Sequence, residues 1–167
     1  MKTIIRIAAL ALTLSIAPAS PGLTRVTSTP YEPHVQRVRI TLASLPEKRA
    51  TLAEVERLTR IGYGFRYRRS HPYIPRPADE VELTGYGDCK DKALWLATRL
   101  GDDSVRFVIG KLSRGARESH AWLEWQSGGV TWILDPTIRS IPRQKRTFSE
   151  NEYIPLWSYT KDAAWRH

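Results

Sequence analysis

One cysteine occurs in the chain, and its surroundings favour a thiol with a chemical task. Cys89 lies where a helix is expected to begin, so the unpaired amides of the first turn, which carry about half a positive charge, favour a thiolate there. His120 and Asp135 follow it in the sequence. A thiol, an imidazole and a carboxylate supply a nucleophile, a general base and a group that orients the base. Each residue alone has an ordinary structural explanation, but together they predict a catalytic triad that acts on amide bonds.

The residues on either side of Cys89 predict the helix that carries it. Asp88 is suited to cap the free amides of the first turn, Asp91 reinforces that cap from the third helical position, and Gly101 ends the helix after Leu100. Apolar residues three and four positions apart continue the face of Cys89, so the thiol is expected to turn toward the core. The backbone amide of Cys89 is the expected oxyanion donor.

His120 and Asp135 belong to two strand-like runs that are joined by a turn signal at residues 126–129. The loop of this hairpin is expected to be either Ser127-Gly128 or all four residues 126–129. Both loops give the same strand register, which pairs Trp125 with Val130 and places His120 opposite Asp135. Opposed residues point to one side of a sheet, with Cβ atoms about 4.5 to 5.5 Å apart. The carboxylate is therefore expected to fix the tautomer of the imidazole, while the cysteine-bearing helix packs across that same face.

The order of the predicted elements indicates the fold class. Helices are expected over 51–62 and 88–100, and strands over 105–112, 119–126, 130–135 and 153–159, while the proline-rich residues 63–82 are expected to form a loop. Because the helices come first and the strands follow, we predict an α+β domain with the cysteine-bearing helix packed on an antiparallel sheet.

The N-terminal residues predict an exported protein. The basic residues Lys2 and Arg6, an apolar run and small residues suited to cleavage make residues 1–19 a predicted signal peptide. The apolar run is too short to span a bilayer, so no stable membrane insertion is expected after cleavage. Residues 20–46 are expected to form an extended leader, and residues 47–167 one compact enzyme domain. The predicted location is periplasmic or secreted.

Composition limits the partners and the metal sites. The formal charge of +9 attracts polyanions in general, but export makes nucleic acid an unexpected partner, and a peptide or protein substrate of the cell envelope is predicted instead. A single cysteine cannot form an internal disulfide. The histidines are scattered and show none of the close paired spacing that zinc sites use, so no metal site is predicted. Nothing in the sequence indicates the oligomeric state.

Three blocks of the sequence resemble the transglutaminase-like superfamily, and most of all the bacterial transglutaminase-like cysteine proteinases. They are Gly85-Tyr86-Gly87-Asp88-Cys89-Lys90-Asp91-Lys92-Ala93, Ser119-His120-Ala121-Trp122-Leu123 and Ile133-Leu134-Asp135-Pro136-Thr137. The resemblance covers approximately residues 47–167. It implies a papain-like α+β core and periplasmic peptide-bond hydrolysis through a thioester acyl-enzyme, with Cys89 as nucleophile, His120 as base and Asp135 as orienter.

The same resemblance bears on cofactors. Members that need calcium carry acidic residues on both sides of the cysteine, whereas Lys90 follows Cys89 here. Because Asp88 alone is a poor calcium site, the sequence predicts no cofactor and no calcium dependence.

Several functional alternatives stay open at this point. Water would resolve the acyl-enzyme in a cysteine peptidase and an amine would resolve it in a transglutaminase, and only the resemblance favours hydrolysis. A binding module of the same fold would hold a peptide or envelope polymer without chemistry. Tyr86 and Trp122 are the candidate substrate-binding residues, and Tyr86 is also the candidate second oxyanion donor. Exported cell-wall peptidases are less favoured, because Lys90-Asp91 follows Cys89 where those enzymes have Ser-Gly.

Overall fold

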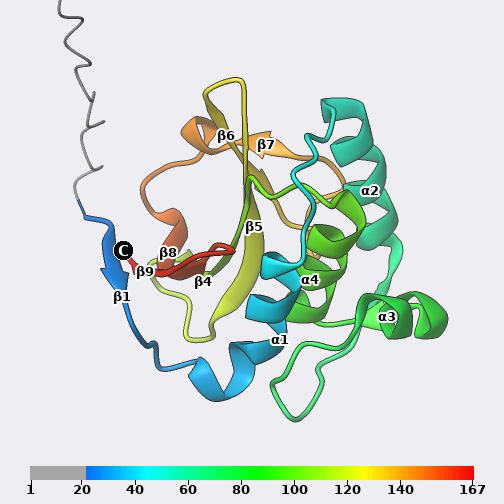
Figure 1. Cartoon of the computed structure of the whole chain (residues 1–167), viewed down its shortest axis with the longest axis horizontal. Helices are drawn as coiled ribbons and strands as arrows, with labels where there is room; N and C mark the ends of the chain where they lie inside the picture. The colour runs from blue at the N-terminus through cyan, green and yellow to red at the C-terminus, as the bar shows by residue number, and fades with distance from the viewer. Residues whose placement is uncertain (1–21) are drawn as a thin grey trace, which may run out of the picture.

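A seven-stranded sheet forms the centre of the protein, and the helices gather on one of its faces (Figure 1). The computed structural model describes residues 22–167, so the predicted signal peptide lies outside the described residues. The strand order is β1-β9-β8-β4-β5-β6-β7, and every neighbouring pair is antiparallel. The strands are β1 (Thr24–Val26), β4 (Val105–Ser113), β5 (His120–Ser127), β6 (Val130–Leu134), β7 (Arg143–Gln144), β8 (Glu152–Tyr159) and β9 (Ala164–Arg166).

The predicted α+β class and antiparallel sheet are confirmed. The helices are α1 (Glu32–Ala43), α2 (Leu52–Gly64), α3 (Ala78–Thr84) and α4 (Cys89–Leu100), with a short 3-10 helix at Lys145–Thr147. Two further short strands, β2 (Arg66–Tyr67) and β3 (Tyr86–Gly87), pair in parallel beside the main sheet. Among residues 22–167, no helix combines the length and the hydropathy that crossing a bilayer requires.

Two segments expected to be irregular contain helices. Helix α1 occupies residues predicted as extended leader, because Val35, Val38 and Leu42 fall on one face of it and join the hydrophobic core. Helix α3 occupies the end of the predicted loop, where Ala78 and Val81 pack into the same core. In both segments, packing of apolar side chains against the sheet and α4 thus stabilises a helix, although the surrounding sequence is rich in proline.

Helix α4 is the central helix of the core, and its start is the start that the sequence predicts. The Asp88 side chain accepts a hydrogen bond from the Asp91 amide, and the Asp91 side chain accepts one from the Asp88 amide, which completes a capping box. Gly101 ends the helix in the left-handed conformation at φ 58°. The box fixes the first turn, and therefore the position of Cys89.

Asp102 joins the end of α4 to the sheet and to the segment before α2. Its buried carboxylate accepts hydrogen bonds from the Ala50 amide (2.8 Å), the Trp125 indole (2.9 Å) and the Ser104 amide (2.8 Å). Burial raises the pKa of Asp102, but these hydrogen bonds lower it by more, so the carboxylate is ionised. One buried anion thus holds three segments that surround the far end of the cysteine-bearing helix.

The predicted register of the β5–β6 hairpin is wrong by two residues. The structure pairs Trp125 with Trp132 and Leu123 with Leu134, around a loop of Gly128 and Gly129. Both glycines have positive φ, 57° and 76°, as the central residues of a type I′ turn require. A shift of two residues preserves which side chains share a face, because strand side chains alternate with a period of two.

The face on which α4 packs also differs from the prediction. Ala121, Leu123 and Leu134 belong to the core that includes α4, whereas Trp122 and Ile133 belong to a second cluster on the opposite face. By strand alternation, His120 shares the side of Trp122, and Asp135 shares the side of Ile133. The expectation that the cysteine-bearing helix lies across their face is therefore wrong, and any meeting of the three groups takes place at the ends of the strands.

Candidate active site

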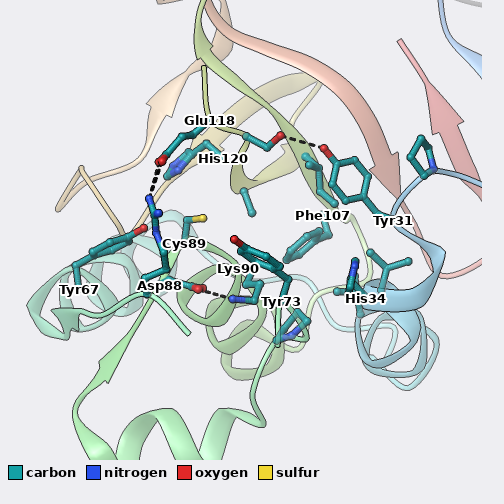
Figure 2. A pocket seen from close by; sticks show the side chains of 18 residues that line it. Tyr31, His34, Tyr67, Tyr73, Asp88, Cys89, Lys90, Phe107, Glu118 and His120 are labelled. Atoms are coloured by element: carbon teal, nitrogen blue, oxygen red, sulfur yellow. Dashed lines mark hydrogen bonds and ion pairs between the residues drawn. The ribbon is translucent and has the colours of Figure 1, made fainter. Parts of the chain in front are cut away.

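The start of α4, the start of β5 and side chains from within β4 surround a cleft of about 450 Å³, and the thiol of Cys89 and the ring of His120 both line it (Figure 2). Cys89 is the first residue of α4 and His120 is the first residue of β5. The thiol is partly exposed, whereas His120 is 9% exposed. The structure thus brings the predicted nucleophile and the predicted base together in one cavity.

Asp135 holds the imidazole from the side away from the cleft. His120 Nε2 lies 2.8 Å from Asp135 Oδ2, and the carboxylate is fully buried. Asp135 also accepts hydrogen bonds from the Tyr153 hydroxyl (2.9 Å) and from the Thr137 amide (3.0 Å). Because Nε2 is engaged by the carboxylate, Nδ1 is the ring nitrogen left for the thiol. Trp122 stacks on the His120 ring at a centroid distance of 6.3 Å, which fixes the ring plane.

The charges around His120 favour its protonated form. Burial of the ring lowers the pKa of His120, but hydrogen bonding to Asp135 and Cys89, together with the negative charges of these groups, raises it by more, to about 10. The ring therefore carries a positive charge at neutral pH. A cation beside a thiol favours the thiolate over the thiol.

Lys92 ties the end of β6 to the helix that carries Cys89. Its side chain is 1% exposed, and its ammonium group donates hydrogen bonds to the carbonyl oxygens of Phe65 and Pro136. Burial lowers the pKa of Lys92, and the nearby Asp135 carboxylate opposes that effect. Since Pro136 follows Asp135 directly, this contact fixes the carboxylate relative to α4.

The proline-rich loop before α3 is held by the two carboxylates that cap α4. Asp88 accepts hydrogen bonds from the Ser70 hydroxyl (3.1 Å) and from the Lys90 ammonium group. Asp91 accepts hydrogen bonds from the Arg76 amide (2.9 Å) and from Arg76 Nε (3.2 Å). Both carboxylates are thus paired with a cation of this chain, and they join the loop wall of the cleft to the start of the helix.

The predicted substrate contacts of Tyr86 and Trp122 are wrong, because neither side chain lines the cleft. Trp122 is 0% exposed and packs with Tyr153 on the far face of the sheet. The Tyr86 ring lies beneath two guanidinium groups, at 4.7 Å from Arg68 and 4.6 Å from Arg76. Tryptophan at strand spacing and tyrosine beside the cysteine are therefore structural here.

Other residues, which the sequence did not indicate, form the walls. Tyr67 lines the cleft because β2 pairs in parallel with β3, which places Tyr67 opposite Gly87, two residues before Cys89. Figure 2 shows the Tyr67 hydroxyl pointing toward the side of the cleft that holds Cys89. A parallel pair of two-residue strands has no local pattern, so no signal in the sequence could have revealed this contact.

The two residues before His120 are tied to opposite walls of the cleft. Glu118 forms an ion pair with Arg69 of the loop wall, at 2.7 Å. The Ser119 hydroxyl lies 3.0 Å from the hydroxyl of Tyr31, in the turn that leads into α1. The start of β5, and with it His120, is thus fixed to both sides of the cleft.

Comparisons with known proteins give matches to solved structures only: no family model matches the sequence, and no curated protein does. LapG of Legionella pneumophila has a TM-score of 0.57 at 19% identity, over 78% of each chain. Its calcium-bound form has a TM-score of 0.58 at 19% identity, again over 78% of each chain. The EGTA-treated form gives 0.55 at 19% identity, over 78% of this chain and 76% of that one. The likeness at this identity concerns the fold.

The LapG structures contradict the prediction that no cofactor is involved, because LapG itself was solved in a calcium-bound form. Within residues 22–167, no three His, Cys, Asp or Glu side chains are grouped as metal ligands would be. The carboxylates nearest Cys89 are those of Asp88 and Asp91, and these already accept hydrogen bonds from Lys90 and Arg76. A divalent ion between them would have to displace both cations, so the side chains as arranged do not fit it.

The fold prediction, in contrast, is confirmed by the same structures. The LapG chain and the present one agree in their α+β core over 78% of each chain. The protein therefore shares the fold of LapG.

Proposed function

We propose that the protein is an exported cysteine peptidase, which hydrolyses peptide bonds of a protein substrate in the cell envelope. The observation that carries this proposal is the shared cleft of Cys89 and His120, with His120 held by the buried Asp135 at 2.8 Å. The protease-like fold supports a protein substrate. Export rests on the predicted signal peptide.

The chemistry begins with the Cys89 thiolate attacking the carbonyl carbon of a peptide bond. As the tetrahedral intermediate collapses, the His120 imidazolium gives its proton to the leaving amine, and a thioester remains on Cys89. His120 then takes a proton from water, whose oxygen attacks the thioester carbonyl. Release of the carboxylic acid restores the thiolate and the imidazolium, with Asp135 stabilising the charged ring throughout.

Two hydrogen-bond donors are proposed for the oxyanion of the tetrahedral intermediate. The first is the Cys89 amide, which has no partner inside the helix because Cys89 is its first residue. The second is the Tyr67 hydroxyl. Burial raises the pKa of Tyr67, and the negative charges of Cys89 and Asp88 add to this, so the hydroxyl keeps its proton. Arg69 lowers the pKa of Tyr67 in part, without reversing the net rise.

Replacement of Tyr67 by phenylalanine removes this donor and keeps the ring. We expect kcat to fall roughly 10²-fold with KM nearly unchanged, because an oxyanion donor acts on the transition state rather than on the bound substrate. Steady-state kinetics on a cleaved peptide measure this split. Tyr63→Phe, on the exposed side of α2, is the matched control and should leave both constants unchanged. A KM effect alone would assign Tyr67 to substrate binding instead.

The proposed function is tested by incubating the mature protein with a peptide library and identifying new termini by mass spectrometry. We expect cleavage by the wild-type protein and none by Cys89→Ser, because a serine hydroxyl ionises far less readily than a thiol and is a much weaker nucleophile in a site arranged for sulfur. Adding a primary amine to the same reaction separates hydrolysis from acyl transfer to the amine. Sequencing the N-terminus of protein from the periplasmic fraction tests export. Equal cleavage by wild type and Cys89→Ser would refute a thiol mechanism.

A further inference from the structure

One group of side chains that line the cleft is apolar, and Cys89 packs against the buried cluster to which these side chains belong. They come from α1 through Val35 and Val38, from β4 through Phe107 and Ile109, and from the start of β5 through Ala121. None of these five side chains is more than 8% exposed, so they form the floor of the cavity rather than its rim. These five residues are called the apolar subsite below.

Aromatic rings form the rim above the apolar subsite. Figure 2 shows Tyr31 and Tyr73 on either side of Phe107, while Cys89 and His120 lie at the neighbouring end of the cleft. Tyr31 is held by its hydrogen bond to Ser119, and the His34 ring contacts Tyr73 edge to face at 6.2 Å between centroids. The rim therefore offers flat apolar surface at fixed positions.

Four charged side chains that line the cleft form two ion pairs with one another. Arg69 pairs with Glu118, and Lys90 pairs with Asp88. A charged substrate side chain that entered the apolar subsite would lose its water without meeting a counter-charge, which is costly. A bulky apolar side chain would instead fill the space and leave the water.

We propose that the apolar subsite selects the substrate, by binding a bulky apolar side chain next to the bond that Cys89 attacks. The class of substrate is thus a peptide segment with leucine, isoleucine, phenylalanine or methionine beside the cleaved bond, and not alanine or an acidic residue. The inference rests on the proposed function, because it takes Cys89 as the attacking group. It adds α1, which lies outside the three sequence blocks around the triad, as the element that determines specificity.

Thiol-directed chloromethyl ketones test this on the wild-type protein. The Cys89 thiolate displaces chloride from acetyl-amino-acid chloromethyl ketones and forms a thioether, so the alkylation rate reports how well the side chain fits beside the sulfur. We expect the leucine and phenylalanine reagents to react at least about tenfold faster than the alanine reagent, and the aspartate reagent to react more slowly than alanine. Rates within twofold of one another would overturn the proposal.

Iodoacetamide, which carries no side chain, separates this inference from the proposed function. Fast iodoacetamide labelling at low pH together with no selectivity among the chloromethyl ketones refutes the apolar subsite alone. Slow iodoacetamide labelling with the pH profile of a free thiol refutes the activated thiol itself.

A pair of variants on α1 tests whether this helix determines the selectivity. Val35→Phe narrows the apolar subsite and should reduce the leucine-to-alanine rate ratio at least fivefold, with each rate normalised to iodoacetamide labelling of the same variant. Ile40→Phe, which adds the same ring on the exposed side of α1, should keep the wild-type ratio. An unchanged ratio in a folded Val35→Phe protein would contradict the assignment of α1 as a specificity element.

Discussion

Replacement of His120 by alanine is expected to slow the alkylation of Cys89 by iodoacetamide about 10²-fold at pH 6. In the wild-type protein burial lowers the pKa of His120, but its hydrogen bonds and the neighbouring negative charge raise it by more, to about 10, so a cationic ring stands beside the sulfur at pH 6. Without the cation, the sulfur loses the neighbouring positive charge that favours its ionised form, so less of the reactive thiolate is present at pH 6. Labelling followed by mass spectrometry between pH 5 and pH 10 measures the difference in rate.

The profile expected for the wild-type protein is nearly flat between pH 6 and pH 9, whereas that of His120→Ala should rise steeply through pH 8. His71→Ala is the matched control, because His71 does not line the cleft and its removal should leave the flat profile intact. If the wild-type protein itself shows the steep profile of a free thiol, Cys89 and His120 do not form an ion pair.

Replacement of Asp135 by asparagine is expected to lower kcat by roughly 10³- to 10⁴-fold, with a much smaller change in KM. The carboxylate accepts hydrogen bonds from His120, Tyr153 and Thr137, and it carries the negative charge that favours the imidazolium. An amide of the same shape supplies no negative charge to favour the imidazolium, and its NH₂ group, if turned toward the ring, would face a ring nitrogen that already carries a proton. Steady-state kinetics on a peptide from the cleavage screen measure the loss.

Tyr153→Phe serves as the graded control for this prediction. It removes one donor from Asp135 and leaves the carboxylate and its contact with His120 in place, so a loss of no more than about tenfold is expected. Thermal unfolding of both variants shows whether they remain folded. Retention of more than a tenth of wild-type kcat by a folded Asp135→Asn protein would argue against Asp135 as the group that orients His120.

The start of α4 shows what local sequence can establish. The Asp88–Asp91 box, the apolar spacing after Cys89 and Gly101 together specify where the helix begins and ends, and the structure has the same bounds. These signals are readable because each acts within about one turn of the helix, where a cap, a charge or a glycine has the same effect in any protein.

The β5–β6 hairpin shows where local sequence stops being sufficient. The four-residue turn signal predicted a hairpin. In the structure Gly128 and Gly129 form the loop, so the strand pairing differs from the predicted one by two residues. His120 and Asp135 nevertheless stay on one side of the sheet, because the alternation of side chains is insensitive to a shift of two. The prediction that the two groups share a face depended only on this parity and survived the error in register.

The chemistry-bearing residues, the caps of their helix and the alternation of their strands were determined by the sequence alone, because each follows from a short-range rule. Only the tertiary structure decided that α4 packs on the face of the sheet opposite to the side chain of His120. Cys89 and His120 therefore meet at the strand ends. It also decided that Tyr67 and α1 form walls of the cleft. Such contacts join segments far apart in the chain, and their geometry is set by how the whole core packs rather than by any local pattern.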